Sequence, residues 1–332
     1  MNIANMERYS RQIAFFGREK QKMLGKSMVS VVGLGATGSA TASLLVRAGI
    51  GGIKLIDRDF VEESNLHRAM LYSETDIDKP KALAAKERLE KINSQCNIKA
   101  FVEDLNPKTM NLLESDLILD CTDNMETRLL INDFSLKHEM PWIYSGAIGN
   151  EGMAASFDGK KPCFRCLFQT VPPSLETCDT VGILSPASFI VSSWQALEAI
   201  RILTDFERPN YGKLFHFSGN SFSFSNIKPN MNCRACMAKN FHFLEKQAKT
   251  AISLCGLNSY HINPNRQHDL DLHSIAKRLS KNPAYKIKSG TSILHMQSKN
   301  HKISIFKDSR VIIAGAKSMA EAKSIYSRIL GV

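Results

Sequence analysis

Four cysteines form two pairs with the spacing of metal ligands, Cys163 with Cys166 and Cys233 with Cys236. A C-x-x-C turn places two thiolates on one side of a tetrahedral ion, so two such turns complete a four-thiolate shell. A closed shell is structural because no position stays open for water. The pattern therefore predicts a structural zinc site that joins two distant segments, with redox-active cysteines as the alternative.

Three glycines follow an apolar run in the stretch VSVVGLGATGS, at Gly33, Gly35 and Gly38. The G-x-G-x-x-G spacing lets the backbone turn tightly against phosphates, and the following helix offers free N–H groups and a positive dipole end. Asp57 lies about 20 residues farther on, a position suited to binding ribose hydroxyl groups. The pattern predicts a dinucleotide or ATP site without distinguishing the two, and a tight turn without a ligand is the alternative.

Basic side chains near these glycines add candidates for binding phosphate. Lys79 and Lys81 flank Pro80 at the start of a predicted helix, an end at which the helix dipole disfavours cations. Each lysine therefore either extends into solvent or binds an anion such as a polyphosphate. Three arginines could also bind phosphate through their guanidinium groups, namely Arg8, Arg11 and Arg68.

Two acidic residues, Asp120 and Asp123, lie in the segment DCTDN at the end of a predicted strand. Open α/β sheets bind their ligands at the carboxyl ends of parallel strands. An acid at that place can hold Mg²⁺ beside phosphates. The alternative is that it caps the helix predicted for the following METRLLIND.

The elements that must position these residues alternate regularly. Strands are expected over residues 28–35, 52–59, 97–104 and 116–124, with helices between them, including 39–49 and 76–93. Strands alternating with helices are typical of a Rossmann-like parallel sheet with covering helices. Beyond residue 140 we expect strands around a glycine-rich turn (141–159), a long loop (160–180), a helix (188–203) and two hairpin-like strands (213–219 and 221–228).

The charge distribution divides the chain into two parts. Residues 1–244 carry 28 Lys and Arg against 27 Asp and Glu, whereas residues 245–332 carry 15 against 5. We expect residues 1–244 to form one domain and residues 245–332 a small, basic α+β domain. The excess charge indicates either a solvated surface or a docking face for an acidic protein or RNA.

The composition, 43% hydrophobic and 23% charged, is typical of a globular protein. The first residues, MNIANMERYS, have no apolar core of signal-peptide length, and no apolar run is long enough to span a membrane. Eight cysteines without an export signal indicate reduced thiols. We therefore expect a cytoplasmic protein with no membrane partner.

Taken together, these residues resemble the ThiF–MoeB–HesA family of relatives of the ubiquitin-activating enzymes. The resemblance covers residues 7–240, with the motifs in the same order as in the family. Residues 245–332 also resemble extensions of some longer family members, but more weakly. It rests on RYSRQ (8–12), VVGLGATGS, LIDRDFVEESNLHR (55–68), KPK (79–81), DCTDN (120–124), both cysteine pairs and ETCDTVGIL (176–184).

The resemblance implies an adenylyltransferase that joins ATP to the C-terminal glycine carboxylate of a ubiquitin-like sulfur carrier protein ending in Gly-Gly, with release of pyrophosphate. The carrier would serve a thiamine, molybdopterin or tRNA-thiolation pathway. A thioester or persulfide step at Cys178 could follow, with a sulfurtransferase as a further partner. Two alternatives stay open. One is a tRNA-modifying relative that adenylates a carboxylate on RNA, and the other is an NAD-dependent oxidoreductase.

The resemblance also implies roles for individual residues. The cofactors would be ATP, Mg²⁺ and structural Zn²⁺, and the enzyme would be a homodimer in which Arg11 reaches the neighbouring subunit's site. Asp123 would serve Mg²⁺ and the reacting α-phosphate. The other nucleotide-binding residues would be Gly33, Gly35 and Gly38 in the loop, Asp57 at the ribose, Asn65, Arg68 and Lys81 at the triphosphate, and Asp59 and Asn124 beside them.

Overall fold

A computed structural model describes residues 7–168, 181–245, 251–254, 259–262, 264, 269–290 and 293–331. The chain divides into two compact units, Met1–Gln247 and Ala248–Val332. Among the described helices, none is both long and apolar enough to cross a membrane.

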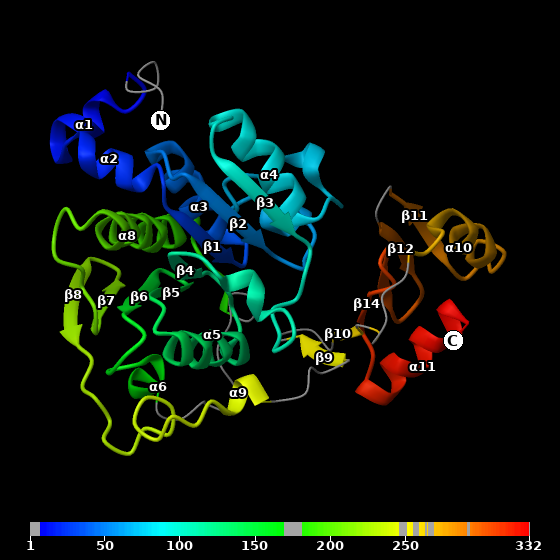
Figure 1. The fold of residues 1–332 in the computed structure, drawn as a ribbon. Helices are drawn as coiled ribbons and strands as arrows, with labels where there is room; N and C mark the ends of the chain where they lie inside the picture. The colour runs from blue at the N-terminus through cyan, green and yellow to red at the C-terminus, as the bar shows by residue number, and fades with distance from the viewer. Residues whose placement is uncertain are drawn as a thin grey trace. The chain divides into compact units, whose positions relative to one another are not determined.

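The first unit is built on an eight-stranded sheet in the order β3-β2-β1-β4-β5-β6-β7-β8 (Figure 1). The neighbouring strands in the first part of this order, β3-β2-β1-β4-β5, pair in parallel. The pairs β5 with β6, β6 with β7 and β7 with β8 are antiparallel. The mostly parallel sheet confirms the predicted fold class. The strands are β1 (Met28–Val32), β2 (Gly52–Ile56), β3 (Asn97–Phe101), β4 (Leu117–Asp120), β5 (Trp142–Ile148), β6 (Glu151–Phe157), β7 (Lys213–Ser218) and β8 (Ser221–Asn226).

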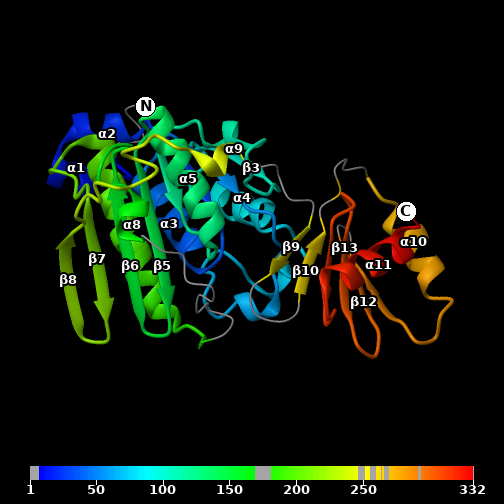
Figure 2. The ribbon, with the colours of Figure 1, turned by 90° about the horizontal axis from the view of Figure 1, so that it is seen from below.

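Helices cover both faces of this sheet because its central strands are apolar on both sides. In β1, Val31 packs in the same core as Leu45 of α3, whereas Val32 packs in the other core with Leu129 of α5. Figures 1 and 2 show α3 and α8 on one side of the sheet and α5 on the other. The first face carries α3 (Ala36–Ala48), α4 (Lys81–Ile92) and α8 (Ser185–Thr204), and the second carries α5 (Met125–His138), α6 (Phe164–Leu167) and α9 (His242–Glu245).

Shorter helices complete the unit. They are α1 (Ser10–Phe16), α2 (Arg18–Leu24) and the 3₁₀ turns η2 (Glu63–Asn65), η3 (Glu74–Asp76) and η4 (Met110–Leu113). The helix predicted over residues 76–93 begins only at Lys81, because Asp78 has φ +70° and Pro80 is the extended N-cap. The residue before a proline is biased away from helical backbone, which separates η3 from α4.

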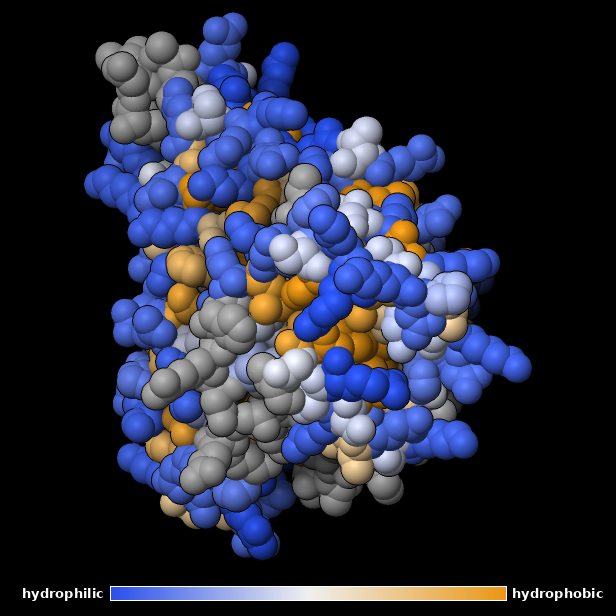
Figure 3. All heavy atoms as spheres, turned by 90° about the vertical axis from the view of Figure 1, so that its right-hand side faces the viewer, coloured by the Kyte–Doolittle hydropathy of each residue, from blue (hydrophilic) through white to orange (hydrophobic). Residues whose placement is uncertain are grey.

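The second unit is a six-stranded antiparallel sheet in the order β11-β12-β13-β14-β10-β9. Two helices, α10 (Leu272–Leu279) and α11 (Met319–Leu330), share an apolar core with it. Figure 3 shows one side of the protein, on which hydrophilic side chains surround an apolar area. The strands are β9 (Ala251–Leu254), β10 (Ser259–Ile262), β11 (Lys286–Ser289), β12 (Ile293–Gln297), β13 (Lys302–Phe306) and β14 (Val311–Ala314).

Candidate functional site

A cavity of about 340 Å³ lies at the carboxyl ends of β1, β2 and β4. The chain reverses its direction of travel across the sheet between β1 and β4, and ligands of open α/β sheets bind at such a reversal. Most of the residues predicted from the sequence line this cavity, namely Gly33, Gly35, Asp57, Asp59, Asn65, Arg68, Lys81, Asp123 and Asn124.

The glycines of the loop allow close backbone packing beside the cavity. Gly33 has φ +84°, and a Cβ on it would lie 2.7 Å from the carbonyl oxygen of Cys121. A Cβ on Gly38 would lie 1.9 Å from the Gly33 carbonyl oxygen, so Gly38 holds α3 against the loop and does not line the cavity. Gly35 is the N-cap of α3 and brings no capping side chain. The first N–H groups of α3 can therefore bind an anion.

Asp57 follows β2 and fastens the two loops beside the cavity. Its Oδ2 accepts the Leu34 N–H at 2.6 Å, and its Oδ1 accepts the Asp59 N–H at 2.7 Å. Burial raises the pKa of Asp57 to about 6, although the nearby Lys81 charge opposes the shift. That Asp57 binds ribose stays a prediction. The hydrogen bonds of Asp57 to the two loops are a structural role that the sequence did not predict.

The two lysines beside Pro80 differ in their surroundings. The Lys81 side chain is 11% exposed, lines the cavity, and its Nζ lies 3.7 Å from Asp59 Oδ2. Burial alone would lower the pKa of Lys81, but surrounding carboxylates, chiefly that of Asp59, outweigh burial and raise it. Lys79 instead contacts Asp76 at 3.1 Å. The anion held by Lys79 is thus a carboxylate of the protein, and Lys81 is the lysine at the cavity.

Asn65, the last residue of the 3₁₀ turn η2, and Arg68, three residues after it, line the cavity. Asn65 is buried, and its Oδ1 accepts the Glu62 N–H at 3.2 Å. Arg68 Nη1 donates to the Ser64 carbonyl at 2.6 Å. The turn therefore orients both side chains through contacts with its own backbone.

The acids at the end of β4 take different roles. Asn124 caps α5 by accepting the Thr127 N–H at 2.8 Å, and Asp123 lines the cavity from an exposed position. Asp120 is fully buried, and its Oδ1 accepts the Thr122 hydroxyl at 2.7 Å. Of the two acids, Asp123 is therefore the one that lines the cavity, whereas Asp120 supports the loop. The role of Asp123 at Mg²⁺ stays a prediction.

Among the cavity residues that sequence reasoning missed, four form two pairs. Arg58 Nη1 lies 2.8 Å from Asp104 Oδ1, joining the ends of β2 and β3. The Arg128 guanidinium lies 4.9 Å from the centre of the Tyr144 ring. Arg128 lies one helical turn after Asn124, the last residue of DCTDN, and this spacing was the signal that could have revealed it.

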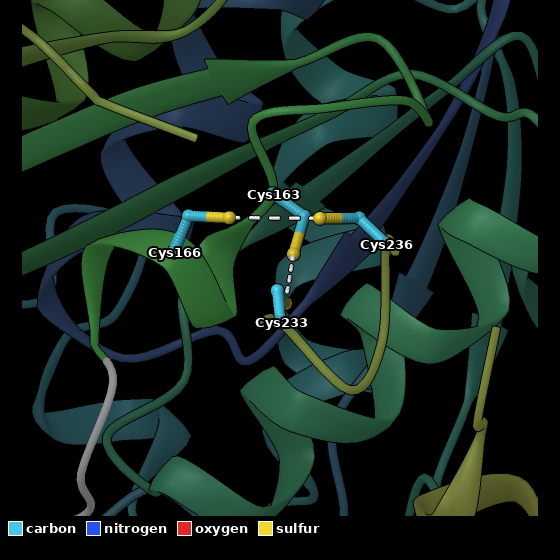
Figure 4. A group of neighbouring side chains, drawn as sticks. All are labelled: Cys163, Cys166, Cys233 and Cys236. Carbon is cyan, nitrogen blue, oxygen red and sulfur yellow. Dashed lines mark hydrogen bonds between the residues drawn. The ribbon is translucent and has the colours of Figure 1, made fainter. Parts of the chain in front are cut away.

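The four cysteines converge beside α5 (Figure 4). Their sulfur atoms lie within 4.8 Å of one another, with 3.7 Å between Cys163 and Cys233 and 3.5 Å between Cys166 and Cys236. Tetrahedral Zn–S bonds of about 2.3 Å require sulfur atoms about 3.8 Å apart. The geometry therefore fits a zinc ion held by four thiolates, as the sequence predicted.

Besides Gly38, two site residues that the resemblance implied are not part of the described cavity. Arg11 is exposed on α1 and is not among the described residues that line it. Cys178 lies outside the described residues. The role of Arg11 in a neighbouring subunit and the covalent role of Cys178 stay predictions.

The fold and site define a nucleotide-binding α/β protein with a four-cysteine cluster. The model of the ThiF family matches residues 9–237. The chain therefore belongs to the ThiF family, as its sequence motifs indicated.

Individual relatives cover the chain to different extents. The sulfur carrier protein ThiS adenylyltransferase of Bacillus subtilis (strain 168) is 37% identical over 336 residues, covering 98% of this chain and 99% of that protein. The adenylyltransferase and sulfurtransferase MOCS3 of Drosophila persimilis is 36% identical over 245 residues, which are 71% of this chain but 54% of that protein. This chain thus spans about half of the MOCS3 length.

Solved structures share the fold at lower identity. The crystal structure of E. coli MccB with ATP superposes with a TM-score of 0.62 at 22% identity, covering 70% of this chain and 75% of that one. The structure of E. coli MccB with MccA-N7isoASN gives a TM-score of 0.63 at 21% identity, covering 71% and 76%. At this identity the comparison establishes the common fold.

Proposed function

We propose that this protein adenylylates the C-terminal carboxylate of a ubiquitin-like sulfur carrier protein with ATP. The observation that carries the proposal is one cavity that combines the glycine loop, Lys81 and Asp123 in a chain similar along its full length to a ThiS adenylyltransferase. The reaction forms an acyl-adenylate and pyrophosphate. It needs positioning and neutralised charge more than a protein nucleophile.

Different residues of the cavity bind different parts of the nucleotide. The N–H groups at the start of α3 and the Lys81 ammonium group bind the phosphates. Asn65 of η2 and Arg68 after it contact the triphosphate, and Asp57 and Asp59 hold the ribose end. Mg²⁺, bound at Asp123, would neutralise phosphate charge, and Zn²⁺ at the four cysteines would stabilise the fold.

The test is ATP–pyrophosphate exchange with purified ThiS. Exchange should depend on ThiS and disappear when its C-terminal glycine carboxylate is converted to an amide. Exchange that depends on tRNA instead would favour the RNA-modifying alternative, and hydride transfer to NAD would favour the oxidoreductase. Replacement of Cys178 by Ser should leave exchange intact and abolish a subsequent thioester or persulfide.

A homodimer is part of the proposal, and an apolar surface on α8 and β8 supports it. Phe222 and Phe224 are 60% and 56% exposed on the edge strand β8, and Leu197 of α8 is 42% exposed. Large exposed apolar patches commonly mark protein interfaces. We expect Phe222→Glu with Phe224→Glu to yield monomers in light scattering.

The position of Arg11 in the partner's site can be tested by complementation. Arg11→Ala and Lys81→Ala should each inactivate a homodimer. A mixed dimer keeps one complete site if Arg11 acts in trans, so reassociated equal mixtures should recover about a quarter of wild-type activity. No recovery, with mixed dimers demonstrated by mass spectrometry, would place Arg11 in its own subunit's site or outside the site.

A further inference from the structure

Arg128 is close to two groups of residues that line the cavity. The first part of the lining comprises the glycine loop and the residues after β4, and the second part comprises residues of β5 and β6, among them Gly146 and Ile148. Arg128 Nη2 donates to the Thr122 carbonyl in the first part. The same nitrogen lies 3.5 Å from the position of a Cβ built on Gly146 in the second part. The guanidinium therefore borders both parts.

Three neighbours fix the orientation of this guanidinium. The Arg128 side chain is 12% exposed, its Nε lies 3.5 Å from Asp120 Oδ2, and its charge lies over the Tyr144 ring at 4.9 Å. Tyr144 in turn packs on Phe164 with ring centres 5.1 Å apart. A cation fixed in this way can stabilise a negative group without reorganising first.

Gly146 keeps the space beside the guanidinium open. A Cβ at this position would lie 2.8 Å from the Tyr144 hydroxyl oxygen, closer than real Cβ contacts allow. The neighbouring positions are also small, Ser145 and Ala147. An extended glycine backbone can therefore pass Gly146 beside Arg128 without meeting a side chain at that position.

We propose that Arg128 binds the reacting C-terminal carboxylate of the carrier and holds it beside the α-phosphate of ATP. The inference rests on the proposed function and adds a substrate-binding residue to it. Without a cation at this junction, the carboxylate would approach the phosphates against like charge. A guanidinium has five N–H donors, so Arg128 can keep its bond to Thr122 and also bind the carboxylate.

The chemical step then balances without a protein acid or base. A carboxylate oxygen forms a bond to the α-phosphorus while the bond from that phosphorus to the α,β-bridging oxygen breaks. Pyrophosphate leaves with the electron pair, and no proton moves. Arg128 partly neutralises the attacking carboxylate and sets its direction.

The test is a binding cycle that combines Arg128→Gln with amidation of the ThiS carboxylate. In the wild-type enzyme, amidation should weaken ThiS binding, measured by calorimetry, about tenfold or more. In Arg128→Gln, both forms of ThiS should bind with the weaker affinity. The affinity for ATP alone should change less than about threefold, and pyrophosphate exchange should fall roughly 100-fold. Arg47→Gln, on the exposed part of α3, is the matched control and should behave as wild type.

Several outcomes would overturn the inference. Amidation that weakens binding equally in wild type and Arg128→Gln shows that Arg128 does not bind the carboxylate. A loss of ATP affinity as large as the loss of ThiS affinity makes Arg128 a nucleotide ligand instead. Arg128→Lys, which keeps the charge, should retain a reduced preference for the carboxylate, and it decides the question if Arg128→Gln fails to fold by circular dichroism. Wild-type enzyme without ThiS-dependent exchange contradicts the proposed function itself.

Discussion

At the scale of single residues, Asp57 combines a ligand position with a structural one. Both of its carboxylate oxygens accept backbone N–H groups of loops that border the cavity. A substitution of Asp57 would therefore change nucleotide affinity in two ways, by removing a contact with the ribose and by releasing the loops that its carboxylate holds. The structural effect can be measured without nucleotide, from the pH dependence of stability that the Asp57 carboxyl confers.

Asp57 should make stability depend on pH. Its pKa is raised from 3.8 to about 6 because burial disfavours the charged form. The folded state thus binds the proton more tightly, and Asp57 adds stability that is fully present below pH 3.8 and lost as the pH rises through about 6. Between pH 4 and pH 8, the free energy of unfolding of wild type should fall by about 2–3 kcal/mol relative to Asp57→Asn. Urea titrations at several pH values measure this difference, and parallel pH profiles would contradict it.

Lys81 should be essential for exchange, whereas another lysine of the same helix should not. Lys81 is nearly buried at the cavity, and Lys86 pairs at 3.7 Å with Glu90 on an exposed surface of α4. We expect Lys81→Ala to lower the rate of pyrophosphate exchange about 100-fold or more. Lys86→Ala should retain the wild-type rate, and equal losses in both variants would indicate an effect on α4 and not on phosphate binding.

The sequence identified many of the residues that line the cavity, among them Lys81 and Asp123, but not how each is held there. The identity of Lys81 and Asp123 followed from motifs at strand and helix ends, where side-chain position depends on local geometry. The pairing of Arg58 with Asp104 depends on β2 lying next to β3, a contact between residues 46 positions apart. Sequence spacing alone carries no information on such a contact.

At the scale of elements, α5 connects the cavity to the cysteine cluster. Its N-terminus carries Asn124 at the cavity. Farther along, Asn132 Oδ1 accepts the Phe164 N–H at 2.9 Å, and Asp133 Oδ2 accepts the Phe243 N–H at 3.0 Å. Phe164 lies between the first two cysteines, so α5 is bonded directly to one of the cysteine turns.

Loss of the Asn132 acceptor should weaken this connection. Asn132 is fully buried, so Asn132→Ala leaves the Phe164 N–H without its acceptor at a cost of about 1–3 kcal/mol in unfolding free energy. We also expect faster release of zinc to a chromogenic chelator. Asn132→Asp keeps an acceptor oxygen and should release zinc more slowly than Asn132→Ala. Identical release from both variants and wild type would show that α5 does not support the metal site.

The start of α4 shows why element boundaries were harder to predict than elements. The apolar spacing of residues 82–92 indicated a helix correctly, but Asp76 ends a separate 3₁₀ turn and Asp78, with φ +70°, belongs to neither element. Asp76 in that turn bonds to Arg88 at 2.7 Å, a contact made with a later turn of α4. A tertiary contact thus stabilises the boundary between η3 and α4, which local sequence propensity did not predict.

At the scale of the whole molecule, the basic excess of residues 245–332 gathers partly on one sheet face. Lys286 and Lys302 stand on either side of Gln297 in neighbouring strands, and Lys288 follows Lys286 at the two-residue repeat of β11. All three lysines are exposed. The opposite face, with Ile287, Met296 and Ile303, packs against the helices of the unit.

Charge reversal on this face should weaken partner capture and leave the chemistry intact. We expect Lys286→Glu, Lys288→Glu and Lys302→Glu together to raise the Kd for ThiS at low salt, with a smaller effect at high salt. The exchange rate at saturating ThiS should not change. A control triple reversal at Lys277, Lys281 and Lys323, which are exposed elsewhere on the unit, should have less effect, and equal effects would indicate a general influence of net charge.

The separation of the two cysteine turns in the sequence also bears on how the protein folds. Cys163 and Cys233 are 70 residues apart, and α8, β7 and β8 all lie within the loop that a shared metal would close. Closing so long a loop removes much conformational entropy from the unfolded chain. An ion at this site would therefore bind the folded arrangement in preference to an unfolded one, and free zinc concentration would become a variable of stability. Growth in zinc-poor medium should therefore lower the amount of folded enzyme before it changes the activity of each folded molecule.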